Sequence, residues 1–236
     1  MKLKVHRAGC RGHVDHGWLN TWHTFSFAGY YNPDRMHFGA LRVLNDDTVQ
    51  AEMGFGTHPH DNMEIITIVL KGELEHRDSM GNGSVIRPGE IQVMSAGTGI
   101  QHSEFNHSAK DEVSLLQIWV FPDKRNVEPR YDQAVFPEEA MKGKWSSIVS
   151  PDGENGSLWI HQQAWFSLGS FEAGSTIECQ PKKAESGLYV FVISGEIVIG
   201  DETLQSRDGI CIEEIPTKIA LKSNTEAKIL VMEVPL

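Results

Sequence analysis

The chain repeats one plan of short strands and glycine turns, and this repetition limits the fold more than any other feature of the sequence. ITIVLKGELEH at 66–76 is echoed by VFVISGEIVIG at 190–200, so that Gly72 corresponds to Gly195. The next turn repeats as well, because RPGEIQV at 87–93 matches RDGICIE at 207–213. Repetition of one supersecondary unit at a long interval indicates a duplicated domain.

Short apolar and β-branched runs separated by turn residues occur from about residue 50 onward. Such runs lie at 65–70, 84–86, 91–94 and 115–121, with turn signals such as Met80-Gly81-Asn82-Gly83 and Pro88-Gly89 between them. Several short strands at spacings of about ten residues predict an all-β barrel or sandwich. We therefore expect two tandem antiparallel β-barrels of the jelly-roll type with few short helices, one of them at about 137–142.

The two expected units meet in a stretch that loses the strand pattern. Residues 122–157 are rich in Pro, Gly and charged residues, which predicts a linker. A length of 236 residues also permits two domains of ordinary size. We place the domains at 1–130 and 131–236.

Two pairs of potential metal ligands lie in the first unit. His58 and His60 are two residues apart, and so are His102 and Glu104. On a β-strand, residues i and i+2 point to the same face, so each pair can present two ligands on one side of its strand. If the two strands face each other across a barrel, the four side chains converge on one point.

Three imidazoles and one carboxylate suit a borderline divalent ion and leave one or two positions for water, substrate or dioxygen. Iron(II), nickel, copper, manganese, cobalt and zinc are all compatible with this set. In the second unit, the positions that match His58 and His60 through the glycine alignment are Pro181 and Lys183. We therefore expect one metal ion per chain, in the first unit.

Composition argues against several other classes of protein. The formal net charge of −11, with no Lys/Arg stripe, disfavours direct binding to nucleic acid. No apolar run approaches the ~20 residues that cross a bilayer, and the first residues do not resemble a secretory signal. Cys10, Cys179 and Cys211 are odd in number and far apart, which fits reduced thiols. We expect a cytoplasmic protein.

The metal-ligand segments also resemble the two cupin motifs, in the form found in the pirin family. The first motif has one residue more before its glycine than the commonest cupin form, and the second has Gly97 where that form has proline; both departures occur in pirins. The resemblance covers nearly the whole chain. It is most specific in HGWLNTWHTFSFAGYYNPDRMHFGALRVLNDD (16–47), GFGTHPHDNMEI (54–65) and SAGTGIQHSEFN (95–106).

The resemblance implies a bicupin in which His58, His60, His102 and Glu104 bind the metal, with iron(II) as the favoured ion. It also implies quercetin 2,3-dioxygenase activity, in which a flavonol binds through its 3-hydroxyl, Glu104 or a metal-bound base takes the proton, and dioxygen cleaves the heterocycle with loss of carbon monoxide. The alternative is a metal-dependent regulator that acts through protein partners, as eukaryotic pirins do. We expect a monomer and leave a dimer open.

Two features stay open between a functional and a structural role. Glu64 is a metal ligand in many other cupins, and here it is either a neighbour of the metal site or a structural polar residue. An aromatic and histidine cluster near the N-terminus either roofs a pocket for a planar ligand or packs in the core. Its members are His13, His16, Trp18, Trp22, His23, Phe25 and Phe27.

Overall fold

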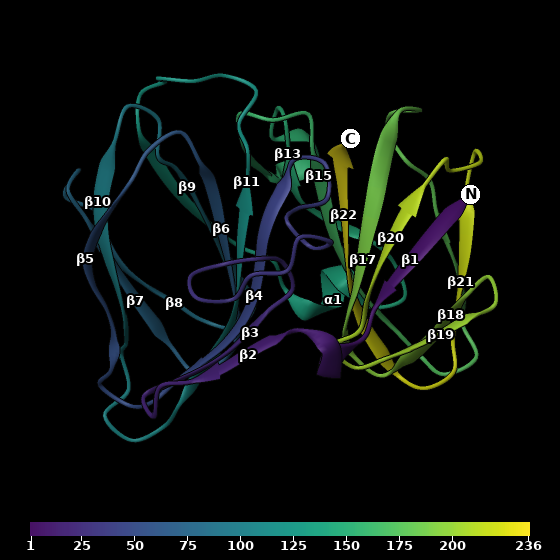
Figure 1. Cartoon of the computed structure of the whole chain (residues 1–236), viewed down its shortest axis with the longest axis horizontal. Coiled ribbons are helices and arrows are strands. Elements are labelled where there is room, and N and C mark those ends of the chain that lie inside the picture. The colour runs from purple at the N-terminus through teal and green to yellow at the C-terminus, as the bar shows by residue number, and fades with distance from the viewer.

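The computed structural model describes residues 1–236 as two packed halves built almost wholly from β-strands (Figure 1). Each half contains one seven-stranded and one four-stranded sheet. The one α-helix, α1 (Glu138–Met141), matches the expected short helix, and 3₁₀ turns lie at Ala8–Cys10 and Glu154–Gly156. No helix has the length and apolar character needed to cross a bilayer. The all-β prediction is confirmed, and the closure of each half into a barrel stays a prediction.

Eleven strands form the sheets of the first half: β2 (Gly12–Asp15), β3 (Leu19–His23), β4 (Leu41–Val49), β5 (Gly54–His60), β6 (Glu64–Lys71), β7 (Leu74–Asp78), β8 (Gly83–Ile86), β9 (Glu90–Ser95), β10 (Ile100–Asn106), β11 (Val113–Val120) and β12 (Arg130–Val135). The large sheet has the order β12-β9-β6-β11-β4-β3-β2, and the small sheet has the order β5-β10-β7-β8.

The second half is built from eleven further strands: β1 (Lys2–His6), β13 (Ser146–Ser150), β14 (Leu158–Trp159), β15 (Trp165–Phe171), β16 (Thr176–Cys179), β17 (Ser186–Ser194), β18 (Glu196–Ile199), β19 (Glu202–Gln205), β20 (Gly209–Glu213), β21 (Ile219–Ser223) and β22 (Ala227–Pro235). Its sheet orders are β1-β20-β17-β22-β15-β13-β14 and β16-β21-β18-β19. The small sheets have the same strand order in both halves, and so do the inner strands β9-β6-β11-β4 and β20-β17-β22-β15 of the large sheets, which confirms the duplicated plan. The edges of the large sheets differ.

The repeated glycines occupy equivalent turns, after β6 in the first half and after β17 in the second. Gly72 has a φ of 78° and Gly195 a φ of 91°, a conformation that other residues rarely adopt. A Cβ atom at Gly72 would lie 2.6 Å from the carbonyl oxygen of Glu112, and one at Gly195 would lie 2.2 Å from that of Glu226. Both turns therefore require glycine, which explains why these positions mark the repeat.

The two halves exchange edge strands. β1, at the N-terminus, pairs with β20 of the second half, and β12 pairs with β9 of the first half. Both pairings join residues from the two sides of the predicted boundary at residue 130. The division of the chain into domains 1–130 and 131–236 stays a prediction. The expectation of a strand-free linker at 122–157 was wrong, because β12 and β13 lie within it. The sequence did not predict β12, because it is a half-exposed edge strand without alternating apolar residues.

The largest apolar core lies between the halves. One cluster of 28 buried residues includes Leu44 and Ile66 of the first half and Tyr189 and Leu230 of the second. β6 is buried on both faces over most of its length, which explains its continuous apolar sequence. An extensive apolar contact of this kind favours a fixed arrangement of the two halves. The interior of the first half holds smaller apolar clusters and has room for polar side chains.

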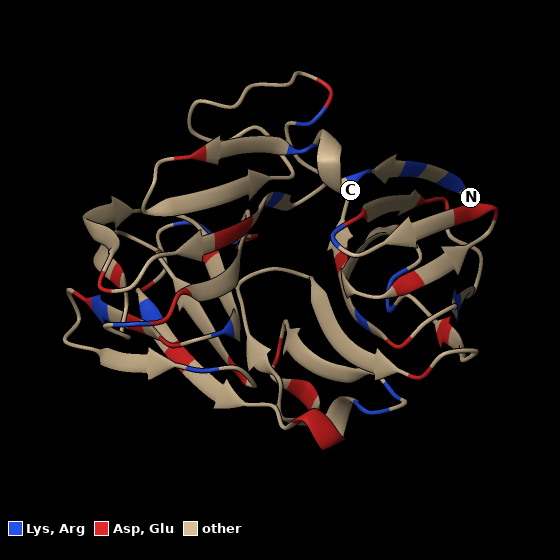
Figure 2. Ribbon diagram, turned by 90° about the horizontal axis from the view of Figure 1, so that it is seen from below, with Lys and Arg blue, Asp and Glu red and all other residues tan.

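Charged residues are spread over both halves, with blue and red segments interspersed along the ribbon (Figure 2). Many of them form surface ion pairs, such as Lys2 with Glu214 and Lys218 with Glu178. The expectation that the chain does not bind nucleic acid stays a prediction.

Candidate metal centre

The two predicted ligand pairs lie on neighbouring strands of the small sheet. β5 carries His58 and His60, and β10 carries His102 and Glu104, with His102 directly opposite His58 in the antiparallel register. The register shifts between His102 and Glu104, which marks a bulge. The two strands do not face each other across a barrel, which was one way for the four side chains to converge, but are neighbours in one sheet. The side chains converge because they project from the same face of adjacent strands.

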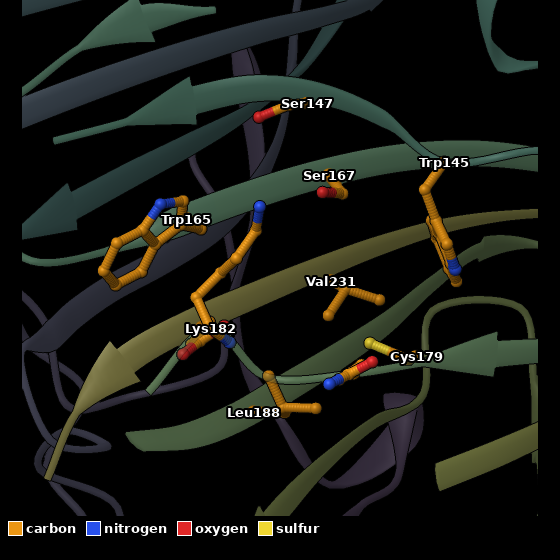
Figure 3. Close-up of a pocket in the computed structure, with 10 residues that line it drawn as sticks. Trp145, Ser147, Trp165, Ser167, Cys179, Lys182, Leu188 and Val231 are labelled. Atoms are coloured by element: carbon orange, nitrogen blue, oxygen red, sulfur yellow. Dashed lines mark hydrogen bonds between the residues drawn. The ribbon is translucent and has the colours of Figure 1, made fainter. Parts of the chain in front are cut away.

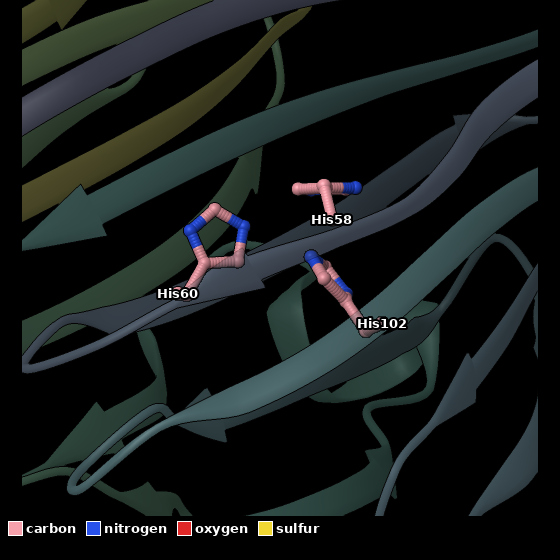
Figure 4. A group of neighbouring side chains, drawn as sticks. All are labelled: His58, His60 and His102. Atoms are coloured by element: carbon pink, nitrogen blue, oxygen red, sulfur yellow. The ribbon is translucent and has the colours of Figure 1, made fainter.

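The three imidazole rings form a compact group in which each ring lies next to the other two (Figure 4). Their ring centroids are 4.4 Å apart for His58 and His102, and 4.8 Å apart for each of the other two pairs. Burial, with a smaller contribution from neighbouring imidazoles, lowers the pKa of His102 to about 2 and that of His60 to about 4. Both rings are therefore neutral near pH 7, and neutral imidazole is the form that binds metal.

Hydrogen bonds leave one nitrogen free on two of these rings. Nδ1 of His58 lies 2.8 Å from the carbonyl oxygen of Gly56 and donates to it, so that Nε2 keeps its lone pair. Nε2 of His102 is buried and has no hydrogen-bond partner. Buried polar atoms in folded proteins are nearly always paired. A metal ion bound among the three rings would supply the partner that Nε2 of His102 lacks.

A second buried histidine lies behind His102. Nδ1 of His76, on β7, is 3.5 Å from Nδ1 of His102, and Nε2 of His76 is 3.4 Å from Oδ2 of Asp78. If His102 donates its Nδ1 proton to His76, then His76 must donate its own Nε2 proton to Asp78, which fixes both tautomers. Tyr131 stacks on His76 with 4.7 Å between ring centroids. The sequence reasoning missed this pair, although His76 and Asp78 show the same two-residue spacing.

Glu104 reaches from the small sheet to the large one and is only 4% exposed. Its Oε2 accepts a hydrogen bond from Nε2 of Gln117 at 2.9 Å, and its Oε1 lies 3.5 Å from the hydroxyl of Thr67. Burial, with a smaller contribution from the charge of Asp47, raises the pKa of Glu104 to about 7. The ligand atoms of Glu104, His76 and His102 lie within 4.8 Å of one another, as do those of His58, His60 and His102. The two groups share His102.

The four predicted ligands border a small cavity of about 80 Å³ between the two sheets. Asp47, on β4, accepts a hydrogen bond from Thr21, and burial raises its pKa to about 7. The sequence reasoning missed the members from β4 and β11, because nothing in their own spacing marks them as facing β5 and β10. The cavity is lined by Phe27, Asn45, Asp47, Phe55, His58, His60, Ile65, His102, Glu104, Gln117 and Trp119.

The structure bears on both features that the sequence left open. Glu64 does not line the cavity, and its carboxylate accepts a 2.7 Å hydrogen bond from Ser95 on the opposite face of β6 from Ile65, which favours a structural role. The aromatic cluster divides: Phe27 lines the cavity, whereas Phe25 belongs to the core between the halves. Trp18 packs against Phe55 at the margin of another apolar cluster.

The chain is a duplicated β-sheet protein with a cluster of imidazoles and a carboxylate between the sheets of one half. Comparison with known proteins shows the family to which it belongs. The family model "Pirin" matches residues 4–120. The model "Quercetinase C-terminal cupin domain" matches residues 147–234. Together with the full-length similarity described next, these matches show that the chain belongs to the pirin family.

A similar protein sequence and a similar solved structure come from Escherichia coli. The quercetin 2,3-dioxygenase of strain K12 is 42% identical over 237 residues, with 99% of each chain covered. The crystal structure of bacterial pirin YhhW in complex with nickel(II) has a TM-score of 0.94 and 40% identity, again with 99% of each chain covered. A quercetin 2,3-dioxygenase structure from Acinetobacter baumannii has a TM-score of 0.77 at 19% identity, covers 98% of this chain and 85% of that one, and supports the fold alone.

Proposed function

We propose that this chain is a metal-dependent dioxygenase that cleaves the heterocycle of flavonols such as quercetin, with loss of carbon monoxide. The observation that carries this proposal is the buried, unpartnered Nε2 of His102 beside the rings of His58 and His60. A carboxylate at the same cavity could serve as a base. Similarity to the quercetin 2,3-dioxygenase of E. coli supports the choice of reaction.

We assign the metal to His58, His60, His102 and Glu104. Three imidazoles and one carboxylate match the ligand preferences of iron(II) and nickel(II). Iron(II) is our first expectation, and the nickel complex of E. coli pirin keeps nickel as the main alternative. When bound, such an ion lowers the pKa of a coordinated hydroxyl and orients it.

The protein's own groups then have separate roles. Glu104 would take the proton of the flavonol 3-hydroxyl, with Gln117 holding the carboxylate in place through the 2.9 Å hydrogen bond. Phe27 and Trp119, in edge-to-face contact at 5.2 Å between ring centroids, would close the cavity to water.

The deciding experiment combines metal analysis with a turnover assay. Protein purified without oxygen should contain one transition-metal ion per chain and should convert quercetin with saturation and release of one carbon monoxide per flavonol. Two ions per chain would contradict the assignment of the metal to the first half. Metal-loaded protein that releases no carbon monoxide would contradict the reaction.

His76→Phe should weaken metal binding while the protein stays folded. The ring of phenylalanine can fill the buried space and still stack on Tyr131, but it cannot accept the proton of His102 Nδ1. Loss of such an outer hydrogen bond typically lowers metal affinity ~10-fold to 100-fold. Competition with a chelator would measure the change. Unchanged affinity in His76→Phe would contradict a role for His76 in orienting His102.

Phe27→Ala should lower the KM for quercetin several-fold with little effect on kcat. A cavity of about 80 Å³ is far smaller than the ~300 Å³ or more of sites that enclose drug-sized ligands. The three rings of a flavonol can therefore enter only if a bordering side chain moves, and Phe27 lies at the border. Tyr31→Ala is the matched control, because Tyr31 is 73% exposed in the same loop and does not line the cavity. A raised KM in Phe27→Ala would instead show that Phe27 binds the substrate.

A further inference from the structure

The second half contains a cavity at the place that the metal centre occupies in the first half. In the first half, Gln117 on β11 pairs with Asn45 on β4 and with Thr67 on β6. In the second half, Val231 on β22 pairs with Ser167 on β15 and with Val190 on β17, which occupy the same places in the sheet order. Val231 and Ser167 line the second cavity, as Gln117 and Asn45 line the first.

This second cavity differs from the first in size and in chemistry. Its volume is about 260 Å³, roughly three times the 80 Å³ of the first. No histidine lines it, and its walls include two tryptophans. The lining consists of Trp145, Ser147, Trp165, Ser167, Cys179, Gln180, Lys182, Leu188, Val231 and Glu233.

The two indoles form opposite ends of the cavity, with the Lys182 side chain extending between them (Figure 3). Nε1 of Trp145 donates to the carbonyl oxygen of Glu178 at 2.9 Å, and its ring packs edge-on against Phe171 at 5.0 Å between centroids. The position of this indole is therefore fixed. Leu188 and Val231 are buried and give the cavity an apolar floor.

Glu233 ties down the loop that covers one side of the cavity. Its carboxylate is part of a residue only 4% exposed, and it accepts hydrogen bonds from the backbone N–H of Lys182 at 2.7 Å and of Lys183 at 2.8 Å. The ammonium of Lys182 is paired with Glu154 at 3.1 Å, with both side chains partly exposed. A buried carboxylate that holds a loop against the cavity makes the cavity a fixed feature of the fold.

Two hydroxyl groups in the cavity, those of Ser147 and Ser167, are free to bind a ligand. Ser147 and Ser167 are opposite each other on β13 and β15, and neither hydroxyl has a hydrogen-bond partner within the protein. A hydroxyl can both donate and accept, so the pair suits a ligand oxygen that does the same. The carboxylates of Glu233 and Glu154, together with the net charge of −11, disfavour an anion.

We propose that this cavity binds a small neutral phenol of one or two rings, between Trp145 and Trp165, with its hydroxyl on Ser147 and Ser167. Flat aromatic rings match the indole walls, and the volume lies below that of sites for drug-sized molecules. A three-ring flavonol would need this cavity to widen, and the hydrogen bonds that hold Trp145 and the loop at Lys182 and Lys183 oppose such a movement. The site is thus separate from the proposed dioxygenase centre in both place and ligand.

Titration of the full chain with 2-naphthol, a two-ring phenol that cannot chelate a metal through two oxygens, tests the proposal. Calorimetry should show one saturable site that persists after removal of metal with a chelator and in His102→Ala. Ser167→Leu, which fills the cavity, and Trp165→Ala, which removes one wall, should each weaken binding about tenfold or more. Ser170→Leu is the matched control, because Ser170 is on the same strand and does not line the cavity.

Each result of this titration either supports the proposed site or overturns it. Loss of affinity in Ser167→Leu and Trp165→Ala, with wild-type affinity in Ser170→Leu, supports the site. Thermal unfolding of each variant shows whether it is folded, and either cavity variant suffices if the other fails to fold. The proposal is overturned if no saturable binding occurs, if both cavity variants bind as tightly as wild type, or if His102→Ala abolishes binding.

Discussion

His102→Ala should give a folded protein that contains no tightly bound metal and has lost its flavonol-cleaving activity. His102 is 2% exposed and belongs to both groups of potential ligand atoms, so its removal disrupts each of them. His58→Ala should have the same effect on activity, since His58 lies directly opposite on β5. Metal content of the purified variants and carbon monoxide release from quercetin are the measurements.

The fold should survive this change because the main apolar clusters do not depend on His102. The 28-residue core between the halves and the 15-residue core of the second half contain no predicted ligand. Nε2 of His102 is also a buried atom without a partner, so that its removal forfeits little hydrogen bonding. We expect the free energy of unfolding of the metal-free protein to change by less than about 2 kcal/mol.

His107→Ala is the matched control for these variants. His107 follows β10 in the chain, but its side chain is 44% exposed and pairs with Glu75 at the surface. Its loss should leave metal content and activity unchanged. Full activity in His102→Ala would argue against the proposed centre, and unfolding of wild-type protein on metal removal would show that the ion is structural.

The sequence predicted which side chains gather at the proposed metal centre because their spacing has a direct geometric meaning. His58 with His60, and His102 with Glu104, share a strand face whatever the rest of the fold does. Gly72 and Gly195 marked the duplication for a similar local reason, since each requires a positive φ next to another backbone segment. His76 and Asp78 carried an equally direct signal.

Other parts of the structure depend on long-range packing and could not be predicted from local patterns. Asn45, Asp47 and Gln117 meet the cavity only because the large sheet lies across from β5 and β10. The pairing of β1 with β20 joins segments about 200 residues apart, and no periodicity within residues 2–6 indicates a partner. The adjacency of β5 and β10 in one sheet, rather than across a barrel, is a property of strand order that the ligand spacing does not contain.

Glu104→Gln should lose far more activity than its weaker metal binding explains. The amide of glutamine presents an oxygen of similar position and size to a metal ion, but it cannot accept the substrate proton as a carboxylate does. Loss of general-base assistance typically lowers the rate ~100-fold to 10,000-fold. The structure favours Glu104 for this role, because its carboxylate borders the cavity and is held by Gln117.

The measurement must separate coordination from proton transfer, so kcat for quercetin is compared at saturating metal with occupancy determined in both proteins. Glu64→Gln is the matched control, because Glu64 is equally buried but hydrogen-bonded to Ser95 outside the cavity, and its kcat should stay near that of wild type. If fully loaded Glu104→Gln cleaved quercetin within a few fold of wild type, Glu104 would keep only its coordinating role. Asp47, the other buried carboxylate that lines the cavity, would then be the next group to test as the base.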